Sequence, residues 1–258
     1  MSGSPGAGDG ALEGIEACVF DAYGTLFDVH SAVAALAARV GPEHERLGVE
    51  WRRRQLEYTW LRTLGGAHAD FRAVTADALA VSMRALGLGD PGPVGSRAAG
   101  ERERATDPAE DSPAGLHAAL MGAYDTLEPF PEVGAALEAL GRAGMPRAIL
   151  SNGTPEMLDA AIGGAGLAHA FEHVLSVEAL GVYKPVPQVY ALATRALGRS
   201  PARVAFLSSN AWDAAGAARF GFRTVWVNRY GQPPEALPGE PERVLPDLAG
   251  LPALLGIG

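Results

Sequence analysis

The stretch FDAYGTLFDVH, residues 20–30, follows a short apolar run and decides how the fold is interpreted. The run from Ala17 to Phe20 predicts a buried strand, and Gly24 predicts a turn soon after it. Asp21 therefore stands at the carboxyl end of the predicted strand. Because open parallel sheets bind their ligands at the carboxyl ends of their strands, Asp21 is the first candidate for a catalytic residue.

Beyond Pro131 the sequence alternates between short apolar strands and amphipathic helices. This alternation predicts an α/β fold with a Rossmann-like parallel-sheet core covered on both faces. The predicted strands are 147–150, 173–176, 204–207 and 224–227, and the predicted helices are 133–143, 155–165, 188–197 and 211–220.

Between the first strand and this alternating region the pattern is helical. Apolar residues recur three and four positions apart from about 30 to 87 and again from 116 to 127. Residues 90–113, rich in Gly, Pro, Arg and Glu, predict a flexible loop. We expect three parts: a disordered tail, 1–13; an α/β core domain, 14–27 and 126–258; and a helical cap domain inserted after the first strand, 28–125.

Composition and charge exclude several function classes. The 258 residues are 48% hydrophobic and have a formal net charge of -9, which argues against nucleic-acid binding but not against a small anionic ligand. A single cysteine excludes an internal disulfide and fits a reducing compartment. With no apolar run long enough for a membrane span and no signal sequence at the N-terminus, we expect a cytoplasmic protein without a membrane partner.

Polar residues follow several of the predicted strands, as one active site at that edge of the sheet requires. Asp21 follows the first strand, Ser151 and Asn152 follow the second, and Lys184 lies in the loop beyond the strand near residue 174. Ser208, Ser209 and Asn210 follow a later strand in the same way.

Four motifs in this order resemble the haloacid dehalogenase superfamily. Asp21 and Thr25 match its Asp-x-x-x-Thr motif, and the others are LSNG at 150–153, VYKP at 182–185 and SSNAWD at 208–213. The resemblance covers roughly residues 15–88 and 116–250 and implies the haloacid dehalogenase fold with a helical cap. It also implies that Asp21 is a nucleophile and that Thr25 hydrogen-bonds near it.

Two departures separate this sequence from the phosphatases of that superfamily. The phosphatases have a second acid two residues after the nucleophile, where this chain has Tyr23. They also have further acids in the last motif, where this chain has Ser209 and Asn210. Asp213 is the only acidic residue that this chain has in that motif. Magnesium needs hard oxygen ligands, and this set is poor in them. Together with WRRRQLEYTWLR at 51–62, these features resemble the L-2-haloacid dehalogenase (type II) branch.

That resemblance implies hydrolysis of short L-2-haloalkanoic acids to D-2-hydroxy acids through an aspartyl ester, with inversion at C2 and with neither metal ion nor cofactor. Arg52 would bind the leaving halide with help from Asn152. Asp213 would be the base that activates water, held in place by Asn210 and Ser208. The implied catalytic set is Asp21, Thr25, Arg52, Lys184, Ser208, Asn210 and Asp213.

The resemblance also implies a set of substrate-binding residues. Ser151 and the backbone N–H groups of Ala22 and Tyr23 would bind the substrate carboxylate, and Tyr190 would orient Lys184 or Asp213. The apolar part of the pocket would be lined by Tyr23, Leu56, Trp60, Phe71 and Trp212.

Plainer interpretations remain open at several of these positions. Trp60 and Phe71 are equally compatible with the hydrophobic core. Ser151 and Asn152 suit a helix N-cap, and Arg52 lies in an arginine run of the kind that usually covers a solvated helix face. Arg53 stands where close relatives often have an uncharged polar residue.

Two other functions compete with dehalogenation. One is a magnesium-dependent phosphatase of the same superfamily, which Tyr23 argues against. The other is a non-catalytic binding protein with this fold, which predicts loss of the catalytic residues, whereas all of them are present. The resemblance further implies a homodimer.

Overall fold

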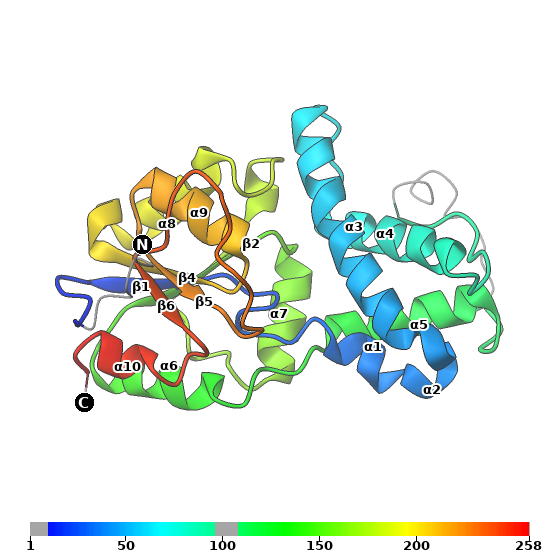
Figure 1. Ribbon diagram of the computed structural model, residues 1–258, viewed down its shortest axis with the longest axis horizontal. Helices are drawn as coiled ribbons and strands as arrows, with labels where there is room; N and C mark the ends of the chain where they lie inside the picture. The colour runs from blue at the N-terminus through cyan, green and yellow to red at the C-terminus, as the bar shows by residue number, and fades with distance from the viewer. Residues whose placement is uncertain (1–9, 96–107, 258) are drawn as a thin grey trace, which may run out of the picture.

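The computed structural model describes residues 10–95 and 108–257. A core with a sheet at its centre lies beside a cap made of helices, and the chain passes between them twice (Figure 1). The first crossing follows strand β1, and the second lies between helices α5 and α6. We propose that the domain boundaries lie at these crossings, close to residues 27 and 126.

The core sheet has six strands in the order β3-β2-β1-β4-β5-β6, and every neighbouring pair is parallel. Strand β1 lies between β2 and β4, and all four of its residues are buried, which explains why its sequence is apolar throughout. This arrangement confirms the expected α/β fold. The strands are β1 (Ala17–Phe20), β2 (Arg147–Ser151), β3 (His173–Ser176), β4 (Val204–Ser208), β5 (Arg223–Val227) and β6 (Arg243–Leu245).

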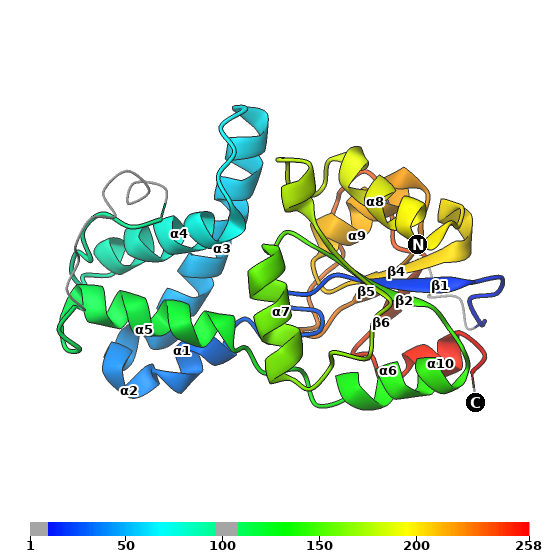
Figure 2. The same ribbon diagram turned by 180° about the vertical axis from the view of Figure 1, so that it is seen from behind.

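Helices cover both faces of the sheet, as the alternating sequence predicts. Helices α6 and α10 lie on one face, and α8 and α9 lie on the other (Figure 2). Helix α7 lies at the side of the core that faces the cap, where it contacts α5. The core helices are α6 (Val133–Arg142), α7 (Pro155–Gly164), α8 (Pro187–Leu197), α9 (Ala211–Phe220) and α10 (Leu251–Leu254), with 3-10 helices η3 (Val177–Ala179) and η4 (Pro201–Arg203).

The cap is built around the packing of its two long helices, α3 and α4. Side-chain caps fix where the later helices begin: Asp70 accepts a hydrogen bond from the backbone of Ala73, and Ser112 accepts one from Gly115. The cap elements are α1 (Ser31–Ala35), α2 (Ala37–Val40), η1 (Gly41–Glu43), α3 (His44–Leu64), α4 (Phe71–Ala85) and α5 (Pro113–Asp125).

The structure departs from the sequence-based expectation in two places. Strand β6 and helix α10 were not predicted, because both are short and their sequences show no clear periodicity. The predicted tail, 1–13, is wrong at its inner end: Leu12 is buried, and its N–H donates to the carbonyl of Leu254. Residues 1–9 and the central part of the predicted loop, 96–107, lie outside the described residues.

None of the helices within residues 10–95 and 108–257 combines the length and the apolar composition that crossing a bilayer requires.

Candidate active site

Asp21 lies in a tight loop at the end of the central strand. Its N–H donates to the carbonyl of Leu207 in β4, which continues the ladder of the sheet by one residue. The chain then folds back, and the N–H groups of Thr25, Leu26 and Phe27 all point to the carbonyl of Ala22. Gly24 has φ +90°, a conformation that favours glycine, so the sequence itself provides for this turn.

The carboxylate of Asp21 is buried and has donors on both oxygens. Lys184 Nζ lies 3.0 Å from Oδ1. Asn210 Nδ2 lies 2.8 Å, Thr25 Oγ1 3.1 Å and Ser208 Oγ 3.4 Å from Oδ2. These contacts explain how a carboxylate that is only 6% exposed is stabilised, because a buried charge requires paired and hydrogen-bonded surroundings.

Lys184, the only lysine in the sequence, joins this carboxylate to a second one. Its ammonium lies 2.8 Å from Asp213 Oδ2, and both residues are almost fully buried. Burial alone would lower the pKa of Lys184, but the two carboxylates outweigh burial and raise its pKa. Burial raises the pKa of Asp213, and Lys184 opposes that shift. One ammonium thus serves two buried acids.

Asp213 is held differently from the prediction. Asn210 and Ser208 were expected to hold it, but both donate to Asp21 instead. The reason is topological: Ser208 is the last residue of β4, the direct neighbour of β1 in the sheet, and Asn210 lies two residues beyond it. Asp213 lies in the first turn of α9, where Tyr190 Oη donates to its Oδ1 at 2.8 Å. Tyr190, expected to touch substrate or to orient Lys184 or Asp213, is fully buried and orients Asp213.

Arg52 reaches the core from cap helix α3. Its Nη2 donates to the carbonyl of Tyr23 at 3.1 Å and to Asn210 Oδ1 at 3.2 Å, while Nη1 donates to Gln55 Oε1 at 2.7 Å. Arg53, which is exposed, instead forms ion pairs with Glu50 and Glu57 of its own helix. Arg52, the arginine that the sequence analysis selected from this run, is therefore connected to Asp21 through Asn210.

A cavity of about 570 Å³ lies where the cap meets the core. Arg52 and Asn210 line it, and Asn210 also donates a hydrogen bond to Asp21, so the cavity lies next to the Asp21 carboxylate's own hydrogen-bond partner. Three of the predicted apolar residues, Leu56, Trp60 and Trp212, also line it, and the two indole rings pack edge to face with centroids 5.4 Å apart.

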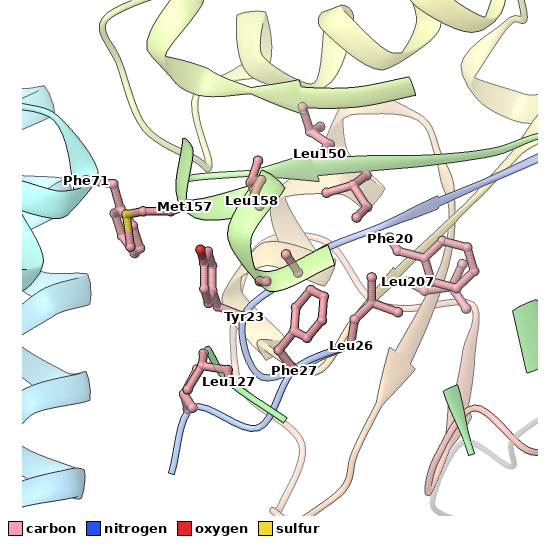
Figure 3. Packing of buried hydrophobic residues seen from close by; sticks show 14 of the residues in the cluster. Phe20, Tyr23, Leu26, Phe27, Phe71, Leu127, Leu150, Met157, Leu158 and Leu207 are labelled. Carbon is pink, nitrogen blue, oxygen red and sulfur yellow. The ribbon is translucent and has the colours of Figure 1, made fainter. Parts of the chain in front are cut away.

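The other two predicted apolar residues, Tyr23 and Phe71, are placed differently. Both are buried, their ring centroids are 5.7 Å apart, and Tyr23 also stacks on Tyr124 at 5.5 Å. Figure 3 shows the Tyr23 ring pointing from the loop after β1 towards Phe71 of the cap. The two residues thus form an aromatic contact between core and cap, and they do not belong to the described wall of the cavity.

The LSNG motif forms a compact turn beside Lys184. Ser151 Oγ accepts from the N–H of Gly153, and Asn152 Oδ1 accepts from the N–H of Lys184. The N-cap of α7 is Thr154, so the plainer interpretation of Ser151 and Asn152 as the cap is wrong. A Cβ atom on Gly153 would lie 2.6 Å from the Tyr23 ring, which explains the glycine.

Sequence reasoning missed several residues near the site. His30 and Tyr230 line the cavity, and their rings pack edge to face. Tyr230 lies in irregular chain after β5, where no pattern indicates a role. Gln55 is nearly fully buried and contacts Arg52. Its position three residues after Arg52 on one helix was a usable signal, because such residues are neighbours on a helix surface.

Within residues 10–95 and 108–257, no group of three or more His, Cys, Asp or Glu side chains is arranged to hold a metal ion.

Comparison with known proteins identifies the family. Residues 15–221 match the family model of haloacid dehalogenase-like hydrolases. The chain is 44% identical over 224 residues to (S)-2-haloacid dehalogenase 4A of Burkholderia cepacia, covering 87% of each protein. A solved dehalogenase structure with an intermediate complex is 42% identical and superposes with a TM-score of 0.83, covering 94% of this chain and 97% of that one.

A second solved structure is L-2-haloacid dehalogenase from Xanthobacter autotrophicus with chloropropionic acid covalently bound. It is 37% identical, has a TM-score of 0.79 and covers 94% of this chain and 98% of its own. The order of the motifs, the fold around Asp21 and these similarities agree. This chain therefore belongs to the haloacid dehalogenase-like hydrolases, in the branch of the (S)-2-haloacid dehalogenases.

Proposed function

We propose that this chain hydrolyses short L-2-haloalkanoic acids to D-2-hydroxy acids through an ester on Asp21. The observation with most weight is the environment of Asp21: a buried carboxylate bonded to one ammonium and three neutral donors, with a tyrosine at the position of the phosphatases' second acid. The solved relative with chloropropionic acid covalently bound supports an enzyme-bound ester.

In the first step, an oxygen of Asp21 attacks C2 of the substrate from the side opposite the halogen. The new C–O bond forms as the carbon–halogen bond breaks, and the halide leaves with the bonding electrons, which inverts C2. We assign the attack to Oδ1, because Oδ2 already accepts three hydrogen bonds whereas Oδ1 accepts one.

The departing halide needs positive charge or donors near it. Arg52 and Arg53 both line the cavity, but Arg52 bonds Asn210, whereas Arg53 is paired with glutamates of its own helix. The substrate carboxylate would be bound by Ser151 and by the backbone N–H groups of Ala22 and Tyr23, with Asn152 near the halide. Leu56, Trp60 and Trp212 supply apolar surface that excludes water from the attacking oxygen.

In the second step, water attacks the carbonyl carbon of the Asp21 ester. Negative charge then develops on Oδ2, where Asn210, Thr25 and Ser208 donate hydrogen bonds. Asp213 accepts the proton lost by water, and its raised pKa makes it a better base than an ordinary aspartate. The bond between the carbonyl carbon and the former Oδ1 breaks, and the departing oxygen takes the proton that Asp213 accepted, so the product leaves as a 2-hydroxy acid. The second proton of the water is released as Asp21 returns to a carboxylate.

The reaction is proposed to need no metal ion. Lys184 already bonds both acids of the site, Asp21 at 3.0 Å and Asp213 at 2.8 Å, so neither carboxylate is left without a cation. A magnesium-dependent phosphatase would instead require carboxylates to bind the ion and an acid at position 23.

Two further properties are proposed. A cytoplasmic location is supported by the single cysteine, Cys18, which is buried and free. A homodimer is supported by exposed apolar side chains on α3, among them Leu61 and Leu64, which are 59% and 84% exposed.

The proposal is tested by halide release from L- and D-2-chloropropionate with a chelator present. We expect release from the L isomer alone. Halide release that needs added magnesium would contradict the metal-independent mechanism. Magnesium-dependent hydrolysis of p-nitrophenyl phosphate, with no release from any short 2-halo acid, would establish the phosphatase instead. No release and no phosphatase activity would favour a non-catalytic protein.

The route through an ester is tested in isotopically labelled water. In a single turnover with excess enzyme, the heavy oxygen should enter Asp21 and not the product. Label in the first-turnover product would mean direct attack of water on C2. Asp21→Asn should abolish turnover and leave the protein folded, as circular dichroism would show, provided that deamidation is excluded by mass.

A further inference from the structure

Gln55, on cap helix α3, is a polar side chain buried within the cap. It is 1% exposed, and all its described contacts are hydrogen bonds to side chains. Nε2 lies 2.7 Å from Thr75 Oγ1 of α4, and Tyr124 Oη of α5 lies 3.1 Å from Nε2 and 3.3 Å from Oε1. Oε1 accepts from Arg52 Nη1 at 2.7 Å. One amide therefore connects three cap helices to the arginine at the cavity.

The amide can adopt only one orientation. Thr75 Oγ1 donates its hydrogen to the carbonyl of Phe71 at 2.6 Å, so it can only accept from Gln55. Arg52 has donors and no acceptor, so it can only be met by an oxygen. The Gln55 amide nitrogen must therefore face Thr75, and its oxygen must face Arg52. A flipped amide would oppose donor to donor at Arg52 and acceptor to acceptor at Thr75.

This bond controls where the Arg52 guanidinium points. Its Nη2 reaches two acceptors of the core, the Tyr23 carbonyl and Asn210 Oδ1, at 3.1 and 3.2 Å. Its bond to Gln55, at 2.7 Å, is the shortest of the three. Arginine has many rotamers, and the hydrogen bond to Gln55 on the cap side restricts the Arg52 side chain to one of them before the substrate binds.

We propose that Gln55 is a positioning residue for halide departure, acting through Arg52; this rests on the proposed function, in which Arg52 stabilises the leaving halide. Gln55 itself touches no reacting atom. Its loss therefore acts mainly on the first step, formation of the ester. Among the groups used in hydrolysis of the ester, Asp213 and the donors around Asp21, only Asn210 is described in contact with Arg52.

The first test is Gln55→Met, which keeps the volume and removes every hydrogen bond. Halide release is measured in a single turnover with excess enzyme on L-2-chloropropionate and L-2-bromopropionate. We expect release of chloride to slow about tenfold to a hundredfold, the effect of one hydrogen bond to a charged group. Bromide should slow less, because the better leaving group depends less on Arg52. Decay of the preformed ester should slow much less than its formation.

Gln55→Glu and His117→Leu separate positioning from stability. The glutamate keeps an acceptor for Arg52 and loses the donors to Thr75 and Tyr124, so halide release should recover towards the wild-type rate. His117 is a buried polar residue of the cap that bonds the carbonyl of Ala76. His117→Leu should lower the melting temperature without changing the ratio of chloride to bromide rates.

A double-mutant cycle with Arg52→Lys completes the experiment. If Gln55 acts through Arg52, Gln55→Met should slow chloride release far less in the Arg52→Lys background than in the wild type. Equal losses in both backgrounds, equal losses for both halides, or a loss shared by His117→Leu would overturn the inference. The proposed function fails separately, if the wild-type protein releases no halide.

Discussion

Replacing Lys184 with methionine should destabilise the protein in a way that depends on pH. The substitution removes the ammonium between two buried carboxylates. Asp21 would keep three neutral donors, including Asn210 at 2.8 Å, whereas Asp213 would keep the Tyr190 hydroxyl. We therefore expect Asp213 to take up a proton in the folded variant.

The size of the effect follows from the free energy needed to protonate Asp213. Protonating a carboxyl group with an ordinary pKa of about 3.9 costs about 4 kcal/mol at pH 7 and about 2 kcal/mol at pH 5.5. The figure at pH 7 agrees with the loss of about 3–5 kcal/mol expected when one partner of a buried ion pair is removed.

The direction with pH follows from proton binding. In the variant, the pKa of Asp213 in the folded state lies above its value in the unfolded chain. The folded state therefore binds the extra proton between these two values, and stability falls as the pH rises through that window. The deficit relative to the wild type should thus grow from pH 5.5 to pH 7.

Urea unfolding followed by tryptophan fluorescence at the two pH values measures this difference. Because the pKa of Asp213 is already raised in the wild type, the deficit in the free energy of unfolding should be larger at pH 7 than at pH 5.5 by at most about 2 kcal/mol. Arg142→Met is the matched control, because Arg142 pairs with Glu138 on the surface, where such pairs contribute little. A deficit equal at both pH values, or one below about 1 kcal/mol, would refute the assignment of Lys184 as the neutralising group.

Three other substitutions test further parts of the structure. Tyr190→Phe removes the donor to Asp213 Oδ1. Hydrolysis of the ester should then slow, so that the ester accumulates during turnover and is visible by intact mass. A wild-type turnover rate with no accumulated ester would contradict that role. Gly153→Ala should destabilise the fold by about 1–3 kcal/mol because its Cβ would meet the Tyr23 ring, whereas Gly163→Ala, in open space, should not. Leu12→Ala should cost about 2–5 kcal/mol in chemical denaturation if residues 10–13 pack as described; no loss would mean that they do not.

The strand-end residues show what sequence reasoning could predict. Asp21, Lys184 and Asn210 were located because a parallel sheet brings the ends of its strands to one edge, so that short polar motifs far apart in sequence must meet there. The positions of the central strands along the chain followed from their apolar composition, whereas their order in the sheet was not predicted.

Contacts between the cap and the core could not be predicted in this way. Phe71 and Trp60 are both aromatic residues in helical sequence, yet Phe71 packs against Tyr23 and Trp60 lines the cavity. Which of them faces the substrate depends on how the cap sits against the core, and periodicity gives no information about that. Strand β6 escaped prediction for a similar reason, because three residues at the edge of a sheet are too few to establish a pattern.

Because Lys184 is the only lysine of this sequence, its burial has a consequence for chemical labelling. Every other basic side chain except histidine is a guanidinium, which does not react with amine-directed reagents under mild conditions. The α-amino group aside, acylation of an amine can then occur only when the site opens and Lys184 loses its proton. The rate of that modification, followed by mass, would report the opening of the active site in the unmutated protein.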